Sequence, residues 1–243
     1  MRAAFPTLPE REQFNRVPRQ YRDVIAAFGL YLVEQMQAQR CLFEALDSSG
    51  IPTRDAKRRG TGWLAGQADI GWSNRIGWYE GFHLLTSITP TGVITGFGFA
   101  SGRCNDHRLV ETFFALRHHP SPRLPSVGAP AQGVYVADKG FAGDQVHRYW
   151  HEQFDAQVIS PPHQRSTVRW SKDWRRWLVG LRQIIETTYD KLLNTFRLAR
   201  ERPHALDGFQ ARLAAKVALH NFCIWLNLHL GREPLAFAEL LDW

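Results

Sequence analysis

The sequence predicts a mixed α/β protein in which helices flank a central sheet that begins with an antiparallel hairpin. Strand-like and helix-like apolar spacings alternate along most of the chain. The turn signal Thr-Pro-Thr-Gly at 89–92 separates two strand-like runs, as in a hairpin. The chain has 243 residues, of which 44% are hydrophobic, enough for one large domain with helical extensions at both ends.

The first segment, residues 9–39, has helical spacing. Its apolar residues recur every three or four positions, which is typical of a helix with one buried face. The stripe expected to be buried consists of Ile25, Phe28, Leu32 and Met36.

The later elements follow from the same two spacings and from turn residues between them. A strand at 41–47 precedes a glycine-rich irregular loop at 54–77. The remaining elements are strands at 78–88 and 93–100, a helix at 107–117, a strand ending at Asp138, a helix at 143–154, a short strand at 157–160, and helices at 173–196 and 208–230. Asp106 is expected to cap the helix at 107–117.

Composition excludes several classes of protein. A formal net charge of +7 favours a polyanionic partner. Three scattered cysteines, Cys41, Cys104 and Cys223, form neither a disulfide framework nor a CxxC zinc motif, so a reducing cytoplasm is expected. No run reaches the roughly 18 apolar residues of a membrane span. For that reason no membrane partner is expected. No GxxxxGK loop occurs, so no nucleotide cofactor is expected either.

Three acidic residues stand out by their settings. Asp47 follows a strand-like run, Asp138 ends another, and Glu186 lies mid-helix among apolar residues. Brought together, such carboxylates could hold two divalent metals against a phosphodiester, because Mg²⁺ prefers oxygen ligands. Each also has a simpler interpretation. The aspartates could be turn or cap residues, and Glu186 could be a solvated partner of Arg182 one turn earlier.

Four segments carry a resemblance to a known family, the bacterial insertion-sequence transposases of the DDE type. Residues 46–60 resemble the first-aspartate region, and 78–84 resemble the hairpin strand that follows it. Residues 136–141 resemble the second-aspartate motif, and 182–186 resemble the helix that carries arginine and glutamate. The similarity extends from about Phe5 to Arg232.

The resemblance implies a ribonuclease-H-like catalytic domain over 41–232. In that fold the first aspartate lies on a central strand, the second at the end of an adjacent strand, and the glutamate on a later helix. Residues 1–40 would be a helical N-terminal segment, part of a DNA-binding region, and 233–243 a C-terminal tail. Relatives carry more sequence before Phe5, so an N-terminally truncated element is expected.

The resemblance also implies the cofactors and partners. Two Mg²⁺ ions, with Mn²⁺ as a substitute, are expected at Asp47, Asp138 and Glu186, with Asp47 bridging both ions. The expected reaction is cleavage of element ends followed by joining to target DNA. The expected partner is double-stranded DNA, bound by a homodimer on paired ends, in the bacterial cytoplasm at the nucleoid.

Basic residues near these motifs are the expected contacts to DNA. They are Arg54, Lys57, Arg58, Arg59, Lys139, Arg175, Arg176, Arg182 and Lys191. Arg175 and Arg176 alternate with Trp170, Trp174 and Trp177, which could stack on unpaired bases or could be core residues. Lys191 is the nearest base after Glu186, where the family has a lysine about two turns later.

Two alternatives to a transposase remain open from the sequence. One is a ribonuclease-H-like nuclease that cuts DNA without joining it. The other is a truncated, inactive remnant that binds DNA.

Overall fold

The computed structural model of the chain describes residues 11–54, 64, 66–73, 75–119, 126–162, 166–238 and 240. The helices are α1 (Arg11–Gln20), α2 (Arg22–Gln35), α3 (Asp106–His118), α4 (Asp144–Phe154), α5 (Lys172–Asp190) and α6 (Leu206–His229). The strands are β1 (Glu44–Arg54), β2 (Asp69–Ser73), β3 (Gly77–Ile88), β4 (Ile94–Ser101), β5 (Val134–Ala137) and β6 (Gln157–Ile159). Short 3₁₀ turns cover Ala38–Arg40, Lys139–Phe141 and Leu198–Arg200, and a π-helical turn covers Lys191–Thr195.

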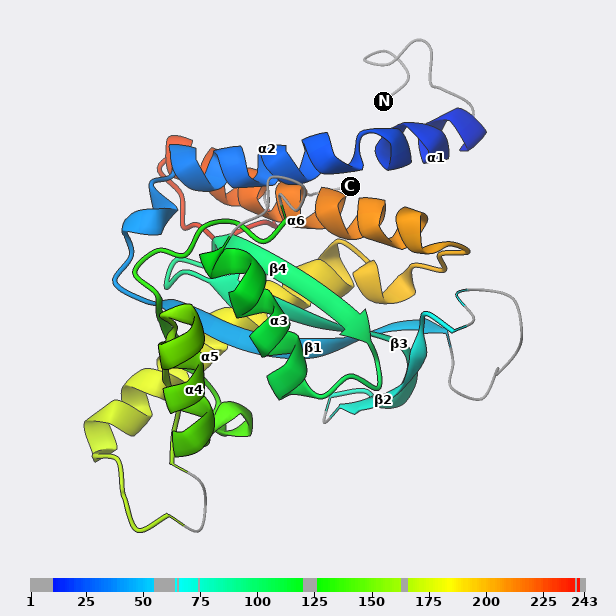
Figure 1. Ribbon diagram of the computed structural model, residues 1–243. Helices are drawn as coiled ribbons and strands as arrows, with labels where there is room; N and C mark the ends of the chain where they lie inside the picture. Colours follow the sequence, from blue (N-terminus) through cyan, green and yellow to red (C-terminus); the bar gives the residue numbers. More distant parts are fainter. Residues whose placement is uncertain are drawn as a thin grey trace.

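The strands form one mixed sheet. β1 pairs antiparallel with β3, which in turn pairs antiparallel with β2 and β4 along successive parts of its length. On its other edge β1 pairs parallel with β5, and β5 pairs parallel with β6. The predicted fold class, a ribonuclease-H-like mixed sheet with an early hairpin and flanking helices, is confirmed (Figure 1).

The strand β2 was not predicted. It lies inside the segment 54–77, where the glycines favoured an irregular loop, and it pairs with the first half of β3 from Asp69 to Ser73. Glycine is needed inside this strand, because a Cβ on Gly71 would lie 2.3 Å from the carbonyl oxygen of Gly102. The prediction for this stretch was therefore wrong over five residues.

The two faces of the sheet have separate cores, because successive side chains of a strand point to opposite faces. Leu46 and Leu85 pack with α3 and with Trp150 of α4. Ile51 and Leu84 pack in a second core that includes residues of α5 and α6. Figure 1 shows α3 and α5 on opposite sides of the sheet.

An ion pair is buried at the first residue of β1. Glu44 and Arg117 are both fully buried, and Arg117 Nη2 donates to Glu44 Oε1 at 2.7 Å. The carboxylate also accepts from the hydroxyl of Thr95 and from the amide of Ala131. The pair ties β1 to the last turn of α3.

The N-terminal helices pack on α6, and most of the predicted stripe is inward, since Ile25 and Met36 are partly buried against the core. Residues of α2 that are buried are Ala26, Gly29, Leu32 and Val33. A Cβ on Gly29 would lie 3.5 Å from Cα of Ala218, which shows how closely α2 approaches α6. Leu32 is buried as predicted, but Phe28 is 45% exposed, so the predicted buried stripe was wrong at that position.

Among the described helices, none combines the length and apolarity that a membrane crossing would require. Even α6, which has 24 residues, carries polar and charged groups along its length.

Candidate active-site groove

Asp47 is the fourth residue of β1 and directly follows the part of the strand that pairs with both β3 and β5. Its Cα partner on β3 is Thr86, and the preceding residue, Leu46, pairs with Ala137 of β5. Asp47 is thus on a central strand and Asp138 directly follows the adjacent parallel strand. Because Leu46 pairs with Ala137, the residues that follow them, Asp47 and Asp138, lie close together.

Asp138 caps the short turn Lys139–Phe141. Its Oδ1 accepts from the amide of Gly140 at 2.6 Å. A Cβ at Gly140 would lie 2.8 Å from that oxygen, so a glycine at this position lets the backbone approach the carboxylate. The cap role considered from sequence is real, and it engages one carboxylate oxygen.

Glu186 lies on α5 beside Arg182. Arg182 Nη2 is 3.8 Å from Glu186 Oε1, and the two side chains are 52% and 69% exposed. The pairing considered from sequence therefore exists. It is loose and solvent-exposed, and exposed pairs of this kind contribute about 0.2–1 kcal/mol at most.

All three carboxyl residues line one groove with a volume of about 980 Å³. Below it, a pocket of about 30 Å³ between β1, β5 and α5 is lined by the same three residues and Arg182. The placements implied by the family resemblance, a central strand, an adjacent strand end and a later helix, agree with the structure.

Burial alters the acidity of Asp47. Removal from water raises its pKa to about 7, and the charges of Asp138 and Asp106 act in the same direction. The amide of Ser48 and the charge of Arg182 oppose the shift. Without a cation, Asp47 is therefore about half protonated at neutral pH.

The donor set suits a hard divalent cation. Carboxylates offer only oxygen, which Mg²⁺ and Mn²⁺ bind in proteins. The charge of Asp138 is among the causes that raise the pKa of Asp47, as expected for two neighbouring carboxyl groups. However, no three His, Cys, Asp or Glu side chains among the described residues are close enough to form a closed metal site. Glu186 would have to leave Arg182 and swing inward to complete one.

Tyr189 connects the strand of Asp47 to the helix of Glu186. It is 5% exposed and lies one turn after Glu186. Its hydroxyl donates to the carbonyl oxygen of Asp47 at 2.7 Å and accepts from the hydroxyl of Thr86 at 2.9 Å. Sequence reasoning missed this residue, because a tyrosine on a buried helix face looks like any core aromatic.

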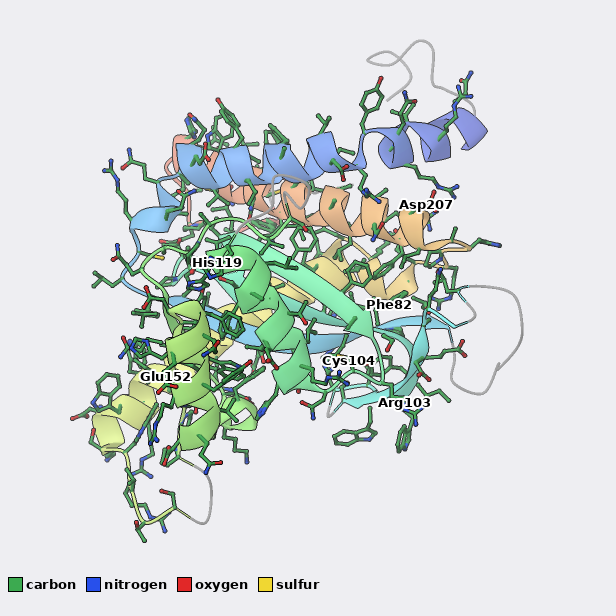
Figure 2. All side chains as sticks on the ribbon, viewed as in Figure 1. Phe82, Arg103, Cys104, His119, Glu152 and Asp207 are labelled. Atoms are coloured by element: carbon green, nitrogen blue, oxygen red, sulfur yellow. The ribbon has the colours of Figure 1, made fainter. Side chains whose placement is uncertain are left out.

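A second missed group holds β1 from the opposite face. The hydroxyl of Ser48 donates to Asp106 Oδ1 at 2.9 Å, and Nε2 of His83 lies 3.4 Å from the same oxygen. Asp106 lies at the start of α3, after the turn in which Figure 2 labels Arg103 and Cys104. The predicted cap role was wrong, since the side chain that accepts from the amide of His107 belongs to Asn105.

The hairpin formed by β2 and β3 supplies the far wall of the groove. Trp72 and Arg75 line it, and Nη2 of Arg75 reaches the carbonyl oxygen of Gly50 at 3.4 Å. Because the stretch was predicted to be an irregular loop, neither residue was singled out from sequence.

The predicted DNA contacts divide into four groups. Lys139 and Arg182 line the groove. Arg175 and Arg176 are exposed on the first turns of α5, outside it. Lys191 is not brought to the groove, since its ammonium lies 5.6 Å from the centre of the Phe237 ring. Lys57, Arg58, Arg59 and the side chain of Arg54 lie outside the described residues.

The tryptophans at the start of α5 are largely solvent-facing. Trp174 and Trp177 are 52% and 37% exposed, and their rings meet edge to face at 5.4 Å. Trp177 also contacts Phe43 at 5.2 Å. Of the two interpretations made from sequence, surface aromatics fit better than core residues.

A family model described as transposase DDE domain matches residues 43–222, which is most of the chain. Among curated proteins no match is found. The chain is similar to a solved structure titled Mos1 transposase paired-end complex with left transposon end, with 16% identity and a TM-score of 0.27. That alignment covers 89% of this chain and 62% of the other. On the strength of the family match, the chain belongs to the transposase DDE domain family.

Proposed function

We propose that this chain is a metal-dependent transposase that cleaves the ends of a DNA element and joins them to target DNA. One observation carries the proposal: Asp47, Asp138 and Glu186, which are far apart in sequence, line the same groove. Family membership gives the reaction class, since DDE transposases are polynucleotidyl transferases. The lining of the groove identifies the residues to test.

The carboxylates would hold two Mg²⁺ ions, or Mn²⁺ in their place. We assign Asp47 to bridge the ions, Asp138 to one and Glu186 to the other. Bound there, the ions would stabilise charge on the attacking and leaving oxygens of a phosphodiester. Arg182, released from Glu186, would be free to contact a phosphate, as would the exposed Lys139.

The chemistry divides into two transfers at phosphorus. In the first, water attacks an end phosphodiester and the bond to the 3′ oxygen breaks, which leaves a 3′-hydroxyl and a 5′-phosphate. In the second, that hydroxyl forms a bond to a target phosphorus while the target's own 3′ oxygen leaves. The number of phosphodiester bonds is unchanged in the second transfer, so it requires no nucleotide cofactor.

Double-stranded DNA, comprising element ends and target, is the proposed partner. The exposed bases Arg175 and Arg176 extend the charged surface from the groove along α5. If they contact phosphates, affinity should fall with rising salt, with a slope of about 0.9 per phosphate in a log–log plot. Arg175→Ala with Arg176→Ala should flatten that slope, and an unchanged slope would remove these residues from the interface.

The domain boundaries and location follow as proposals. We assign residues 41–232 to the catalytic unit and 233–243 to a tail, and we place the protein at the bacterial nucleoid in the cytoplasm. We further propose that residues 1–40 form a helical N-terminal segment that is part of a DNA-binding region.

The deciding experiment compares Asp138→Asn with a matched control. Plasmid DNA that carries the sequences flanking the reading frame is incubated with Mg²⁺ or Mn²⁺, and nicking is measured. Asp155→Asn makes the same chemical change at an exposed residue that ends α4 with φ +54, a conformation that asparagine tolerates. Wild type and Asp155→Asn should nick, and Asp138→Asn should not.

Equal nicking by Asp138→Asn and wild type would falsify the catalytic assignment. A second arm supplies pre-cleaved ends and target DNA and measures joined products. Cleavage without joining would indicate that the protein is a nuclease and not a transposase. DNA binding without either reaction would indicate an inactive remnant.

A further inference from the structure

The hairpin of β2 and β3 presents two exposed tryptophans beside the groove. Trp72 is 53% exposed and Trp78 is 71% exposed. The two residues are direct cross-strand partners, so their side chains leave the same face of the hairpin. Trp72 also lines the groove of the three carboxyl residues. Large apolar rings exposed together at the rim of a site are suited to binding a ligand. We call Trp72 and Trp78 the tryptophan pair.

The opposite face of the hairpin is seated firmly on the sheet. Tyr79, which pairs with Gly71, is 2% exposed there. A Cβ on Gly50 would lie 2.6 Å from the ring of Tyr79, and a Cβ on Gly71 would lie 2.7 Å from its hydroxyl oxygen. The ring therefore packs against the backbone of β1 and β2 at places where a glycine leaves room. Figure 1 shows the hairpin at the edge of the sheet, away from α1 and α2. This packing holds the tryptophan pair on a rigid support.

Arg75, in the turn between the two strands, adds a cation beside the tryptophan pair. It lines the groove, and within the described part of the chain it has one long hydrogen bond, to the carbonyl oxygen of Gly50 at 3.4 Å, and no ion pair. Partial burial lowers the pKa of Arg75, and the charge of Asp190 opposes the shift. A partly buried guanidinium without a paired carboxylate is suited to a phosphate, which can accept two of its N–H groups.

Cations therefore lie on both sides of the carboxyl residues. Lys139 follows β5 and Arg182 lies on α5, whereas Arg75 belongs to the far wall. A DNA strand with one phosphodiester at the carboxylates would have a neighbouring phosphate near Lys139 in one direction and near Arg75 in the other. The base next to the phosphate at Arg75 would then reach Trp72.

The chemistry of the tryptophan pair favours an unpaired base over paired DNA. An indole binds a base by stacking on its flat face. Inside a duplex, neighbouring base pairs cover both faces of each base, so only an unpaired or terminal base offers one. The indole N–H is a single donor and reads little sequence, so such a site accepts any base.

We infer that the β2–β3 hairpin is a binding site for an unpaired nucleotide of the DNA strand in the groove. Arg75 holds a phosphate of that strand, and the tryptophan pair stacks on a base next to it. The inference rests on the proposed function, because it requires DNA in the groove. The site itself uses no metal, so its binding can be measured without one.

Binding of labelled single strands in EDTA tests the aromatic part of the site. The probes are a thymidine strand of about 12 nucleotides and an abasic strand of equal length, which keeps the phosphates and lacks the bases. Wild type should bind the thymidine strand at least about fivefold more tightly. Trp72→Ala should lose most of that preference, and Trp72→Phe should keep part of it. Tyr149→Ala removes a ring that is 43% exposed on α4, outside the groove, and should behave like wild type.

A wild type without base preference, or full preference in Trp72→Ala, overturns the inference. A relaxed, closed circular duplex gives a second comparison, because all of its bases are paired. Wild type and Trp72→Ala should bind it equally. A loss in Trp72→Ala as large as that on the thymidine strand would mean that the hairpin contacts paired DNA, and it would overturn the assignment to an unpaired nucleotide.

Salt dependence tests the role of Arg75. Arg75→Ala should weaken binding of both single strands alike and reduce the slope of log affinity against log salt by about 0.7, the value for one phosphate of a single strand. Arg148→Ala removes an exposed cation from α4 and should leave the slope unchanged. An unchanged slope in Arg75→Ala would contradict the phosphate contact.

Failure of this inference can be told from failure of the proposed function. The binding measurements contain no metal, and the nicking comparison of Asp138→Asn with wild type uses no hairpin variant. Nicking that requires Asp138, in a protein without base preference, would remove the hairpin site and leave the transposase assignment intact.

Discussion

Two glutamate–arginine pairs in this protein have opposite surroundings. Glu44 and Arg117 are fully buried at 2.7 Å, and the carboxylate has further donors in Thr95 and Ala131. Glu186 and Arg182 are more than half exposed at 3.8 Å. The first carboxylate has its hydrogen-bonding capacity largely filled by the protein. The second is held by one weak partner and can be redirected.

The difference separates a residue that maintains the fold from one available for chemistry. Burial makes the loss of one partner costly, because the other is left as an uncompensated charge. Exposure makes the loss of a partner cheap, because water replaces it. Residue type alone does not distinguish the two pairs, but their environment does.

The largest effect on stability is expected from Glu44→Gln. This substitution leaves Arg117 without its counter-charge and should lower the free energy of unfolding by about 3–5 kcal/mol. Urea denaturation followed by circular dichroism would measure it. A loss below about 1 kcal/mol would show that the buried pair is not the structural element described here.

Glu186→Gln should give the opposite pattern. Its free energy of unfolding should change by less than about 1 kcal/mol, since only an exposed pair is lost. Nicking in Mg²⁺ should fall by about 100-fold or more, because a metal ligand loses its charge. Full activity in Glu186→Gln would place Glu186 among the solvated helix residues and outside the site.

A smaller effect is expected from pH on cation binding. The pKa of Asp47 is raised to about 7, so the carboxyl is mostly neutral at pH 6 and mostly charged at pH 8. Only the charged form binds a cation, so the affinity for Mn²⁺ should rise by about tenfold between these two values. Calorimetric titration at pH 6, 7 and 8 would measure it. A flat affinity would contradict the raised pKa.

The smallest effect is expected from Tyr189→Phe. The ring keeps its packing, but the hydrogen bond to the carbonyl of Asp47 is lost. One such bond is worth about 1 kcal/mol, so the Mg²⁺ concentration for half-maximal nicking should rise by about three- to fivefold.

Tyr135→Phe is the matched control for that change. It removes another buried hydroxyl, which bonds to His118 at 3.0 Å on the other face of the sheet. It should lower stability without changing the Mg²⁺ requirement. An equal change in both variants would reduce Tyr189 to a core residue with no role in positioning.

Much of the fold could be predicted from local spacing, and the failures have physical causes. The hairpin at 78–100 and the helices α3 to α6 follow from alternating and helical patterns, because each buries one face in a single core. β2 was missed because its short run lies among glycines whose small size serves close backbone contacts. Phe28 was misplaced because spacing shows that a helix has an apolar face without showing which apolar face is inward.

The candidate site was less accessible from local pattern. The carboxyl residues were selected by a family resemblance, since their separation in sequence shows nothing about convergence. Tyr189 and Asp106 were missed because their partners, the carbonyl of Asp47 and the hydroxyl of Ser48, are defined only by the folded strand. Long-range hydrogen bonds of this kind leave no local signal.

The alternation of Asp47 and Ser48 on β1 has a consequence for how the gene can vary. The two residues point to opposite faces of the sheet, one toward Tyr189 and α5, the other toward Asp106 and α3. Deleting a single residue upstream within β1 would exchange their faces and present a hydroxyl where the carboxylate belongs. In-frame insertions and deletions should therefore be tolerated in surface loops. Inside this strand they should abolish activity.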